Sequence, residues 1–354
     1  MKQATITAGH YCLPPYKLTN EELEERFGAK AVASVTKMSG IQCRRIASEE
    51  ITATDLAYTA ANRMLESLNI DPATVDGLIF ASQTPDHPIP PSSSILHHRL
   101  GLGKACFTLD ISIGCPAFPY ACSVAESLIA TEKCSKVLVL MADVVSRYVN
   151  ANDRSLAALH GDGAAALLLE ATDREYGFKG FRFGAESSGW EHIVVPAGGA
   201  RLACSPDTAL EKNVEPGVTR NAQQLAMNGP AVFQFSISEI PNAVDQALHE
   251  LELTLDDIDL VILHQANRTM LELIYKRLRV PPAKQFYFIE EVGNLAAASS
   301  PVTLLEAMRR GKIEPHSTTM VVSFGNGLNW GVSIHKWGDQ IESLNSASFE
   351  YASG

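Results

Sequence analysis

Cys115 stands where an apolar strand pattern gives way to a helical one. An apolar strand pattern ends at Gly114, and apolar side chains then recur from Phe118 to Ile129 with the spacing of one buried helix face. Pro116 suits a first helical turn, where the missing N–H costs no hydrogen bond. We therefore expect Cys115 at or next to a helix N-terminus, where the helix dipole favours the nucleophilic thiolate.

Two polar residues further along the chain could assist such a nucleophile. His264 directly follows the buried strand pattern 261–263, and chemistry collects at the carboxyl ends of strands in parallel α/β sheets. Asn294 follows a glycine at a turn into a small-residue helix. Taken alone, each of the three residues also fits a structural role: a buried cysteine, a core histidine and an N-cap asparagine.

An internal repeat favours the catalytic interpretation. Residues 68–80 and 251–263 each end a helix and enter a strand, about half the chain apart. The buried strand pattern 137–142 is matched in the same way by 319–324. The repeat gives Cys115 and Asn294 equivalent helix starts, and it places the glycine-rich loop after residue 324 beside them. Three separate signals therefore converge on one crevice.

The same repeat predicts the fold class. Strands separated by helices of this length favour parallel pairing with covered faces. We expect an α/β protein built from two fused halves, 1–173 and 174–354, in which two sheets sandwich helices.

Composition and charge limit the classes of function. The chain has 354 residues, 46% of them apolar, which is enough for a large core. A net charge of −11 argues against nucleic acid as a partner. No apolar stretch approaches the roughly 18 residues of a membrane span and no leader pattern begins the chain, so we expect a cytoplasmic protein. Seven irregularly spaced cysteines without a C-x-x-C pair predict free thiols and no metal site.

These residues and motifs together resemble β-ketoacyl-ACP synthase III, a condensing enzyme of the thiolase superfamily. The resemblance runs nearly end to end. It is carried by residues 40–45, 83–86, 91–94, 161–165, 227–233, 264–267, 293–299, 324–327 and 330–331. It implies a thiolase-like fold, with duplicated halves forming a layered α-β-α-β-α sandwich.

The resemblance also implies an acyltransferase mechanism. Cys115 takes an acyl group from acyl-CoA or an acyl-ACP. His264 and Asn294 then hold the carbonyl oxygen of a malonyl-type thioester while it loses CO2, and the resulting carbanion attacks the acyl group. The backbone N–H groups of Cys115 and Asn326 receive the acyl oxyanion. No metal or redox cofactor is implied.

Binding residues and partners follow from the same resemblance. Arg154, Gly229 and Asn267 are expected to hold CoA or phosphopantetheine. Arg268, Lys276 and Arg277 are the candidates for docking an acyl carrier protein. Residues 87–91 predict a homodimer or a heterodimer with a related subunit, because in relatives this apolar segment reaches the neighbouring acyl pocket.

Several positions depart from the family pattern. Ser34 and Met38 replace a tryptophan that stacks on the CoA adenine and a nearby arginine. Thr269 and Gln234 replace basic contacts for the carrier, and Asn326 replaces a glycine of the loop after residue 324, as Ala117 does after the nucleophile. These changes favour a specialised member of fatty-acid or polyketide-type biosynthesis, with a carrier-bound or loosely held acyl donor.

Related classes of enzyme would require residues that this sequence lacks. A biosynthetic thiolase needs a second cysteine late in the chain, but none follows Cys204. Elongating ketosynthases carry a second histidine where Asn294 stands, and a hydroxymethylglutaryl-CoA synthase needs a glutamate base that Glu126 does not obviously supply. Two alternatives remain. One is an acyltransferase that moves the Cys115 acyl group to a non-malonyl nucleophile, and the other is a subunit of a heterodimeric ketosynthase.

Overall fold

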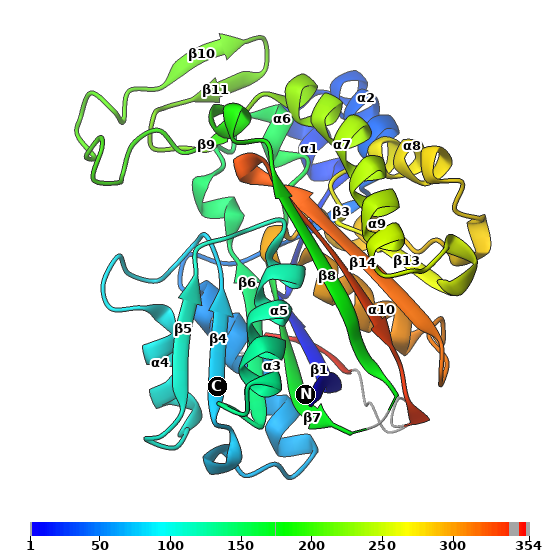
Figure 1. Ribbon diagram of the computed structural model, residues 1–354. Helices are drawn as coiled ribbons and strands as arrows, with labels where there is room; N and C mark the ends of the chain where they lie inside the picture. Colours follow the sequence, from blue (N-terminus) through cyan, green and yellow to red (C-terminus); the bar gives the residue numbers. More distant parts are fainter. Residues whose placement is uncertain (1, 174, 340–346, 352–354) are drawn as a thin grey trace.

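Two β-sheets organise the chain in the computed structural model, which describes residues 2–173, 175–339 and 347–351 (Figure 1). The first sheet has the strand order β16-β1-β7-β6-β4-β5. Its strands are β1 (Gln3–Leu13), β4 (Gly77–Ala81), β5 (Phe107–Ile111), β6 (Lys136–Asp143), β7 (Gly163–Thr172) and β16 (Ala347–Glu350). The central strand β6 is buried from Val137 onward, as its apolar sequence predicts for a strand covered on both faces.

The second sheet has the strand order β13-β14-β15-β8. Its strands are β8 (Gly177–Ala185), β13 (Leu260–Leu263), β14 (Thr318–Gly325) and β15 (Asn329–Lys336). The chain passes from one sheet to the other between Thr172, which ends β7, and Gly177, which begins β8. Near its other end it returns to the first sheet, where β16 pairs with β1.

The expectation of parallel pairing holds for only part of each sheet. Strands β4, β5 and β6 pair in parallel, and so do β13 and β14. However, β7 runs antiparallel to both β1 and β6, and β15 runs antiparallel to both β14 and β8. In each half the chain turns back after its last parallel strand, so the helix-separated pattern could not predict these antiparallel strands.

Helices fill the space between the sheets and cover their outer faces. The inner helices α5 (Ala117–Ala130) and α10 (Ser299–Arg309) contact strands of both sheets. The first sheet also packs against α3 (Ala53–Ser67) and α4 (Ser92–Leu100), and the second packs against α7 (Gly229–Glu250), which contacts α8 (Arg268–Leu278). The result is the expected thiolase-like α-β-α-β-α sandwich.

Shorter elements gather beyond the carboxyl ends of the parallel strands (Figure 1). The helices are α1 (Asn20–Phe27), α2 (Ala29–Ser39), α6 (Arg154–Ala157) and α9 (Ile289–Val292). The paired strands are β2 (Tyr16–Thr19) with β3 (Cys43–Ile46), β9 (Ile193–Val194) with β12 (Ala226–Met227), and β10 (Lys212–Glu215) with β11 (Val218–Arg220). Within the described residues, no helix is long and apolar enough to cross a membrane.

Candidate active site

Cys115 lies immediately before the cap of the central helix α5. Pro116 is the N-cap residue and the helix begins at Ala117, one residue later than the position expected for the proline. The buried helix face predicted from Phe118 to Ile129 is confirmed. On the other side, a Cβ atom at Gly325 would lie only 2.8 Å from the Cys115 sulfur, so the backbone of β14 can approach the thiol this closely only with glycine.

Burial, rather than the helix terminus, dominates the electrostatics of Cys115. Burial, with a smaller contribution from the carboxylate of Asp143, raises the pKa of the Cys115 thiol to about 12. The backbone N–H groups of Asn326 and of Cys115 itself act in the opposite direction. These N–H groups favour the thiolate in the expected direction, but the cost of desolvating the anion exceeds their contribution, so the pKa is raised overall. At neutral pH the Cys115 side chain is therefore a thiol.

His264 follows β13, as expected from its place after the buried strand. Its backbone N–H donates to the carbonyl of Val322, which fixes the residue against β14. The imidazole is 1% exposed and packs edge-on against the ring of Phe324. Burial lowers the pKa of His264 to about 3. The ring is therefore neutral at physiological pH, and it can donate one N–H hydrogen bond without carrying a charge.

Asn294 is oriented by hydrogen bonds on both its backbone and its side chain. Its backbone N–H donates to the carbonyl of Leu159, and its Oδ1 accepts from the N–H of Ala296 at the start of a short 3₁₀ turn. Because Oδ1 is occupied, the amide presents Nδ2 as a donor for a ligand. The helix α10 starts only at Ser299, later than the sequence pattern indicated.

One cavity of about 520 Å³ brings these side chains together, and it is called the catalytic cavity below. Cys115, His264 and Asn294 all line it, together with Gly229 and Asn267, which were expected to bind phosphopantetheine. The remaining wall is mainly apolar: Met38, Leu159, Ile193, Met227, Pro230, Val232, Phe233, Ala266, Met270 and Phe324. Such a cavity suits an acyl chain and a thioester, with a few polar groups to orient them.

The catalytic cavity continues into a second hollow that reaches Arg154. Met38, Met227 and Gly229 line both spaces, and Ser34 lines the second beside Arg154. Arg154 packs against the β10–β11 turn, because a Cβ atom at Gly217 would meet its guanidinium at 3.1 Å. The expected site for the CoA adenine is therefore an open hollow. Met38, 50% exposed, lies where it joins the catalytic cavity.

The basic residues proposed for carrier docking differ in whether acidic neighbours neutralise their charges. Arg268 forms ion pairs with Glu272 and Glu290, and its guanidinium lies 3.7 Å from the ring centre of Tyr287. Lys276 and Arg277 are exposed on the last turn of α8. The charge of Arg268 is thus largely neutralised within the protein, which leaves the other two as the stronger candidates.

His160 is a residue of the catalytic cavity that the sequence analysis did not single out. It lies in the turn between α6 and β7 and is 8% exposed. It directly precedes the glycine of the 161–165 motif, so its position was visible in the sequence. Its orientation was not, because that depends on backbone contacts with Asn294.

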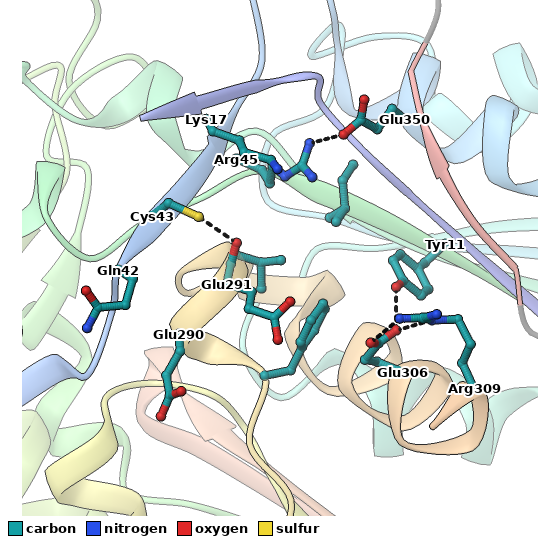
Figure 2. A pocket seen from close by; sticks show the side chains of 13 residues that line it. Tyr11, Lys17, Gln42, Cys43, Arg45, Glu290, Glu291, Glu306, Arg309 and Glu350 are labelled. Atoms are coloured by element: carbon teal, nitrogen blue, oxygen red, sulfur yellow. Dashed lines mark hydrogen bonds and ion pairs between the residues drawn. The ribbon is translucent and has the colours of Figure 1, made fainter. Parts of the chain in front are cut away.

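A charged pocket of about 450 Å³ lies at a different place, between β1, β3, α9 and α10 (Figure 2). Every carboxylate that lines it is paired. Glu306 binds Arg309 and Arg310, Glu291 binds Arg310, Glu350 binds Arg45, and Glu290 binds Arg268. Among the described parts of the chain, no three His, Cys, Asp or Glu side chains are placed to hold a metal ion.

Comparison with known proteins agrees with this arrangement. Residues 109–187 match the family model for 3-oxoacyl-[acyl-carrier-protein (ACP)] synthase III, and residues 248–337 match the model for its C-terminal part. The first segment contains Cys115, and the second contains His264, Asn294 and Asn326. A β-ketoacyl-[acyl-carrier-protein] synthase III of Caldanaerobacter subterraneus is 36% identical over 94% of this chain and 97% of its own length.

Solved structures give the same result. A 3-oxoacyl-(acyl-carrier-protein) synthase III matches 95% of this chain and 100% of its own with a TM-score of 0.92 and 33% identity. A 3-oxoacyl-(acyl-carrier protein) synthase of Burkholderia xenovorans matches 99% of this chain and 98% of its own, with a TM-score of 0.90 and 30% identity. The priming β-ketosynthase of the R1128 polyketide pathway matches 96% of this chain and 97% of its own, with a TM-score of 0.84 and 25% identity.

The layered fold is that of a thiolase-like protein, and the family models and relatives make it an acyltransferase. Relatives at this identity and coverage make the assignment more specific. The chain belongs to the 3-oxoacyl-ACP synthase III family of ketosynthases.

Proposed function

We propose that this enzyme loads an acyl group on Cys115 and condenses it with a malonyl-type thioester, in specialised fatty-acid or polyketide-type biosynthesis. The observation that carries the proposal is that Cys115, His264 and Asn294 line one apolar cavity. A thiol nucleophile and two neutral hydrogen-bond donors suffice for this chemistry, so the reaction we propose uses no metal or redox cofactor.

In the loading step the Cys115 sulfur attacks the thioester carbonyl and its proton passes to the departing thiol of CoA or phosphopantetheine. The oxygen of the tetrahedral intermediate accepts from the N–H groups of Cys115 and Asn326, the two backbone donors beside the sulfur. Collapse of the intermediate breaks the old C–S bond and leaves the acyl group on Cys115.

In the condensing step the carbonyl oxygen of the second thioester accepts hydrogen bonds from His264 and from Nδ2 of Asn294. The bond to the carboxylate breaks, CO2 leaves, and the electron pair forms an enolate whose charge these donors stabilise. The enolate carbon then attacks the Cys115 acyl group. The cysteine sulfur departs as a thiolate and recovers a proton.

The acyl donor is proposed to arrive on a carrier protein or on weakly held CoA. Arg154, Gly229 and Asn267 lie along the route from the second hollow to Cys115. Ser34 and Met38 supply no aromatic ring beside Arg154, and stacking on an aromatic ring is worth ~1–3 kcal/mol per base. Lys276 and Arg277 are the proposed contacts for an acidic carrier. The names of several relatives specify an acyl carrier protein.

A dimer is proposed on a separate observation. In the segment 87–91, the Ile89 side chain is 85% exposed, as expected for an apolar residue that a second subunit covers. Light scattering should give about twice the chain mass of 38.3 kDa, for a homodimer or for a pair with a related subunit. A species of 38.3 kDa at micromolar concentration would contradict this proposal.

Product analysis tests the proposed reaction. The enzyme is incubated with a panel of acyl-CoAs and acyl-ACPs plus ¹⁴C-carboxyl malonyl-ACP, and both released CO2 and the β-ketoacyl product are measured. Condensation predicts one CO2 for each product. Transfer of the acyl group to an amine or alcohol without CO2 release would instead indicate the acyltransferase alternative.

A further inference from the structure

Most polar side chains of the catalytic cavity are already satisfied by the protein. Ser236 Oγ donates to the carbonyl of Val232, Thr269 Oγ1 donates to that of Met38, and Asn267 Oδ1 accepts from the N–H of Met270. These hydrogen bonds occupy Ser236 Oγ, Thr269 Oγ1 and Asn267 Oδ1 within the protein.

His160 differs from them. Both of its ring nitrogens are buried, and neither has a hydrogen-bond partner among residues 2–173, 175–339 and 347–351. Burial lowers the pKa of His160 to about 4, although the Asn294 backbone and Asp153 oppose this shift. The ring is therefore a neutral imidazole with one N–H donor and one acceptor, and its main polar interaction within the protein is with the Asn294 backbone.

The backbone around His160 fixes it beside the condensing residues. The Gly161 N–H donates to the Asn294 carbonyl, and the Asn294 N–H donates to the Leu159 carbonyl, which makes His160 and Asn294 bridge partners. Bridged residues project their side chains to the same face, and both line the catalytic cavity. The imidazoles of His160 and His264 are also close enough to affect each other electrostatically.

An unsatisfied imidazole in an apolar cavity destabilises the folded protein, because its lost contacts with water are not replaced. A ligand that hydrogen-bonds the ring would remove this cost. Only the interaction with the Asn294 backbone restrains the ring, so rotation about its Cβ–Cγ bond can present a nitrogen to the cavity.

The chemistry of the proposed reaction indicates which group of the substrate would hydrogen-bond the His160 ring. The acyl oxygen has the backbone donors of Cys115 and Asn326, and the carbonyl oxygen of the second thioester has His264 and Asn294. The carboxylate of a malonyl-type thioester has no assigned partner, and it must lie within one carbon of the group held by Asn294.

We propose that His160 is a specificity-determining residue that donates a hydrogen bond to the carboxylate of the second thioester. The inference rests on the proposed condensing function and names the residue that selects a malonyl-type substrate. The bond to His160 is present in the bound substrate and is lost as the carboxylate leaves as CO2. It therefore contributes to binding and lowers KM, without stabilising the transition state of decarboxylation.

The test is steady-state kinetics of His160→Phe and His160→Gln with malonyl-ACP. His160→Phe should raise the malonyl-ACP KM roughly tenfold, the effect of one hydrogen bond to a charged group, with kcat unchanged or higher. His160→Gln keeps an N–H donor and should recover part of the lost affinity. Loading of Cys115 by acyl-CoA, followed by intact mass, should change less than the malonyl-ACP KM in both variants.

Thermal stability separates this role from a structural one. His160→Phe should keep or raise Tm, because it removes an unsatisfied polar group. The matched control is His335→Phe, also a buried histidine, whose Nε2 accepts from the N–H of Ile6 and lies 3.2 Å from Oγ1 of Thr5. This control should lower Tm and leave the malonyl-ACP KM unchanged.

Three outcomes would overturn the proposal: an unchanged KM in His160→Phe, loss of loading, or a lower Tm with no kinetic change. If wild-type enzyme loads an acyl group but releases no CO2 from malonyl-ACP, the proposed function fails first. If wild-type enzyme condenses normally and His160→Phe has the same malonyl-ACP KM as wild type, only the inference about His160 fails.

Discussion

The catalytic cavity and the charged pocket of Figure 2 are similar in volume and opposite in character. The charged pocket contains many ionised groups, and its carboxylates are all paired within the protein. The catalytic cavity is mainly apolar, yet His264 and His160 keep ring nitrogens without protein partners among the described residues. Paired charges stabilise the fold, whereas unpaired polar groups in an apolar cavity are available to a substrate. The number of charged residues in a pocket is therefore a poor guide to function.

Changes to His264 and Asn294, the proposed condensing donors, should have the largest effect on turnover. In the proposed mechanism, His264→Ala or Asn294→Ala removes a hydrogen bond to the developing enolate, and loss of one such donor costs ~10²–10³-fold in kcat. Both variants should still load acyl groups on Cys115, because the loading oxyanion uses backbone donors. Quenched-flow mass analysis of loading, beside product formation, checks this. If both variants are folded and neither loads, the assignment of roles is wrong.

The pH dependence of loading should be the next largest effect. With a Cys115 pKa of about 12, the reactive thiolate fraction rises about tenfold for each pH unit below that value. The single-turnover acylation rate should therefore climb about tenfold per unit from pH 6 to pH 9. His264, with a pKa of about 3, stays neutral throughout, so the condensing step should be nearly flat. An acylation rate that levels off below pH 7 would show that the thiolate is stabilised.

Charge reversal on α8 should change carrier recognition modestly. Lys276→Glu should raise KM for acyl-ACP roughly two- to fivefold, since exposed ion pairs contribute ~0.2–1 kcal/mol. Arg268→Glu should have a smaller effect on docking, because Glu272 and Glu290 already neutralise Arg268. The KM for acyl-CoA serves as the control. Equal changes for both donors would argue against a carrier contact.

A variant in the charged pocket should leave turnover unchanged while lowering stability. Glu306 is fully buried and accepts hydrogen bonds from Tyr11, Arg309 and Arg310. Glu306→Ala should lower the free energy of unfolding by about 3 kcal/mol, the lower range for breaking a buried ion pair. Urea unfolding measures this change, and the single-turnover loading rate of the folded variant is the control. A large loss of catalytic rate would contradict the view that the charged pocket serves stability and the catalytic cavity serves catalysis.

The stability loss should also depend on pH. Burial raises the pKa of Glu306, but the hydrogen bonds from Arg309, Tyr11 and Arg310 outweigh it and lower the pKa overall. A carboxylate with a lowered pKa stabilises the folded state above its unfolded pKa, and this stabilisation is lost as pH falls through the folded value. The difference in the free energy of unfolding between wild type and Glu306→Gln should therefore become smaller as the pH falls.

The sequence predicted the parts of the site that depend on local pattern. The strand-to-helix turn at Cys115, the strand exit at His264 and the internal repeat were enough to predict one shared crevice. The fold class followed from the same repeat, and the resemblance made the family specific. Antiparallel strands β7 and β15 were missed, because the direction of a strand depends on where the chain turns rather than on its composition.

Features that depend on contacts distant in sequence were not predicted. His160 is directed into the catalytic cavity by hydrogen bonds between its neighbours and Asn294, and no local pattern reports them. Similarly, the weakened charge of Arg268 depends partly on Glu290, which belongs to another helix. The high pKa of Cys115 results from burial, which outweighs the backbone N–H groups beside the helix start that the sequence indicated.

The central claim is that Cys115 carries the acyl intermediate, and peptide mapping of the acylated enzyme tests it most directly. Wild-type enzyme incubated with the acyl thioester that loads best should gain one acyl mass, located on the peptide that contains Cys115. Cys115→Ala should remain unmodified, although Cys106 and Cys122 are still present. An acyl group found on Cys106 or Cys122, or retained by Cys115→Ala, would contradict the account.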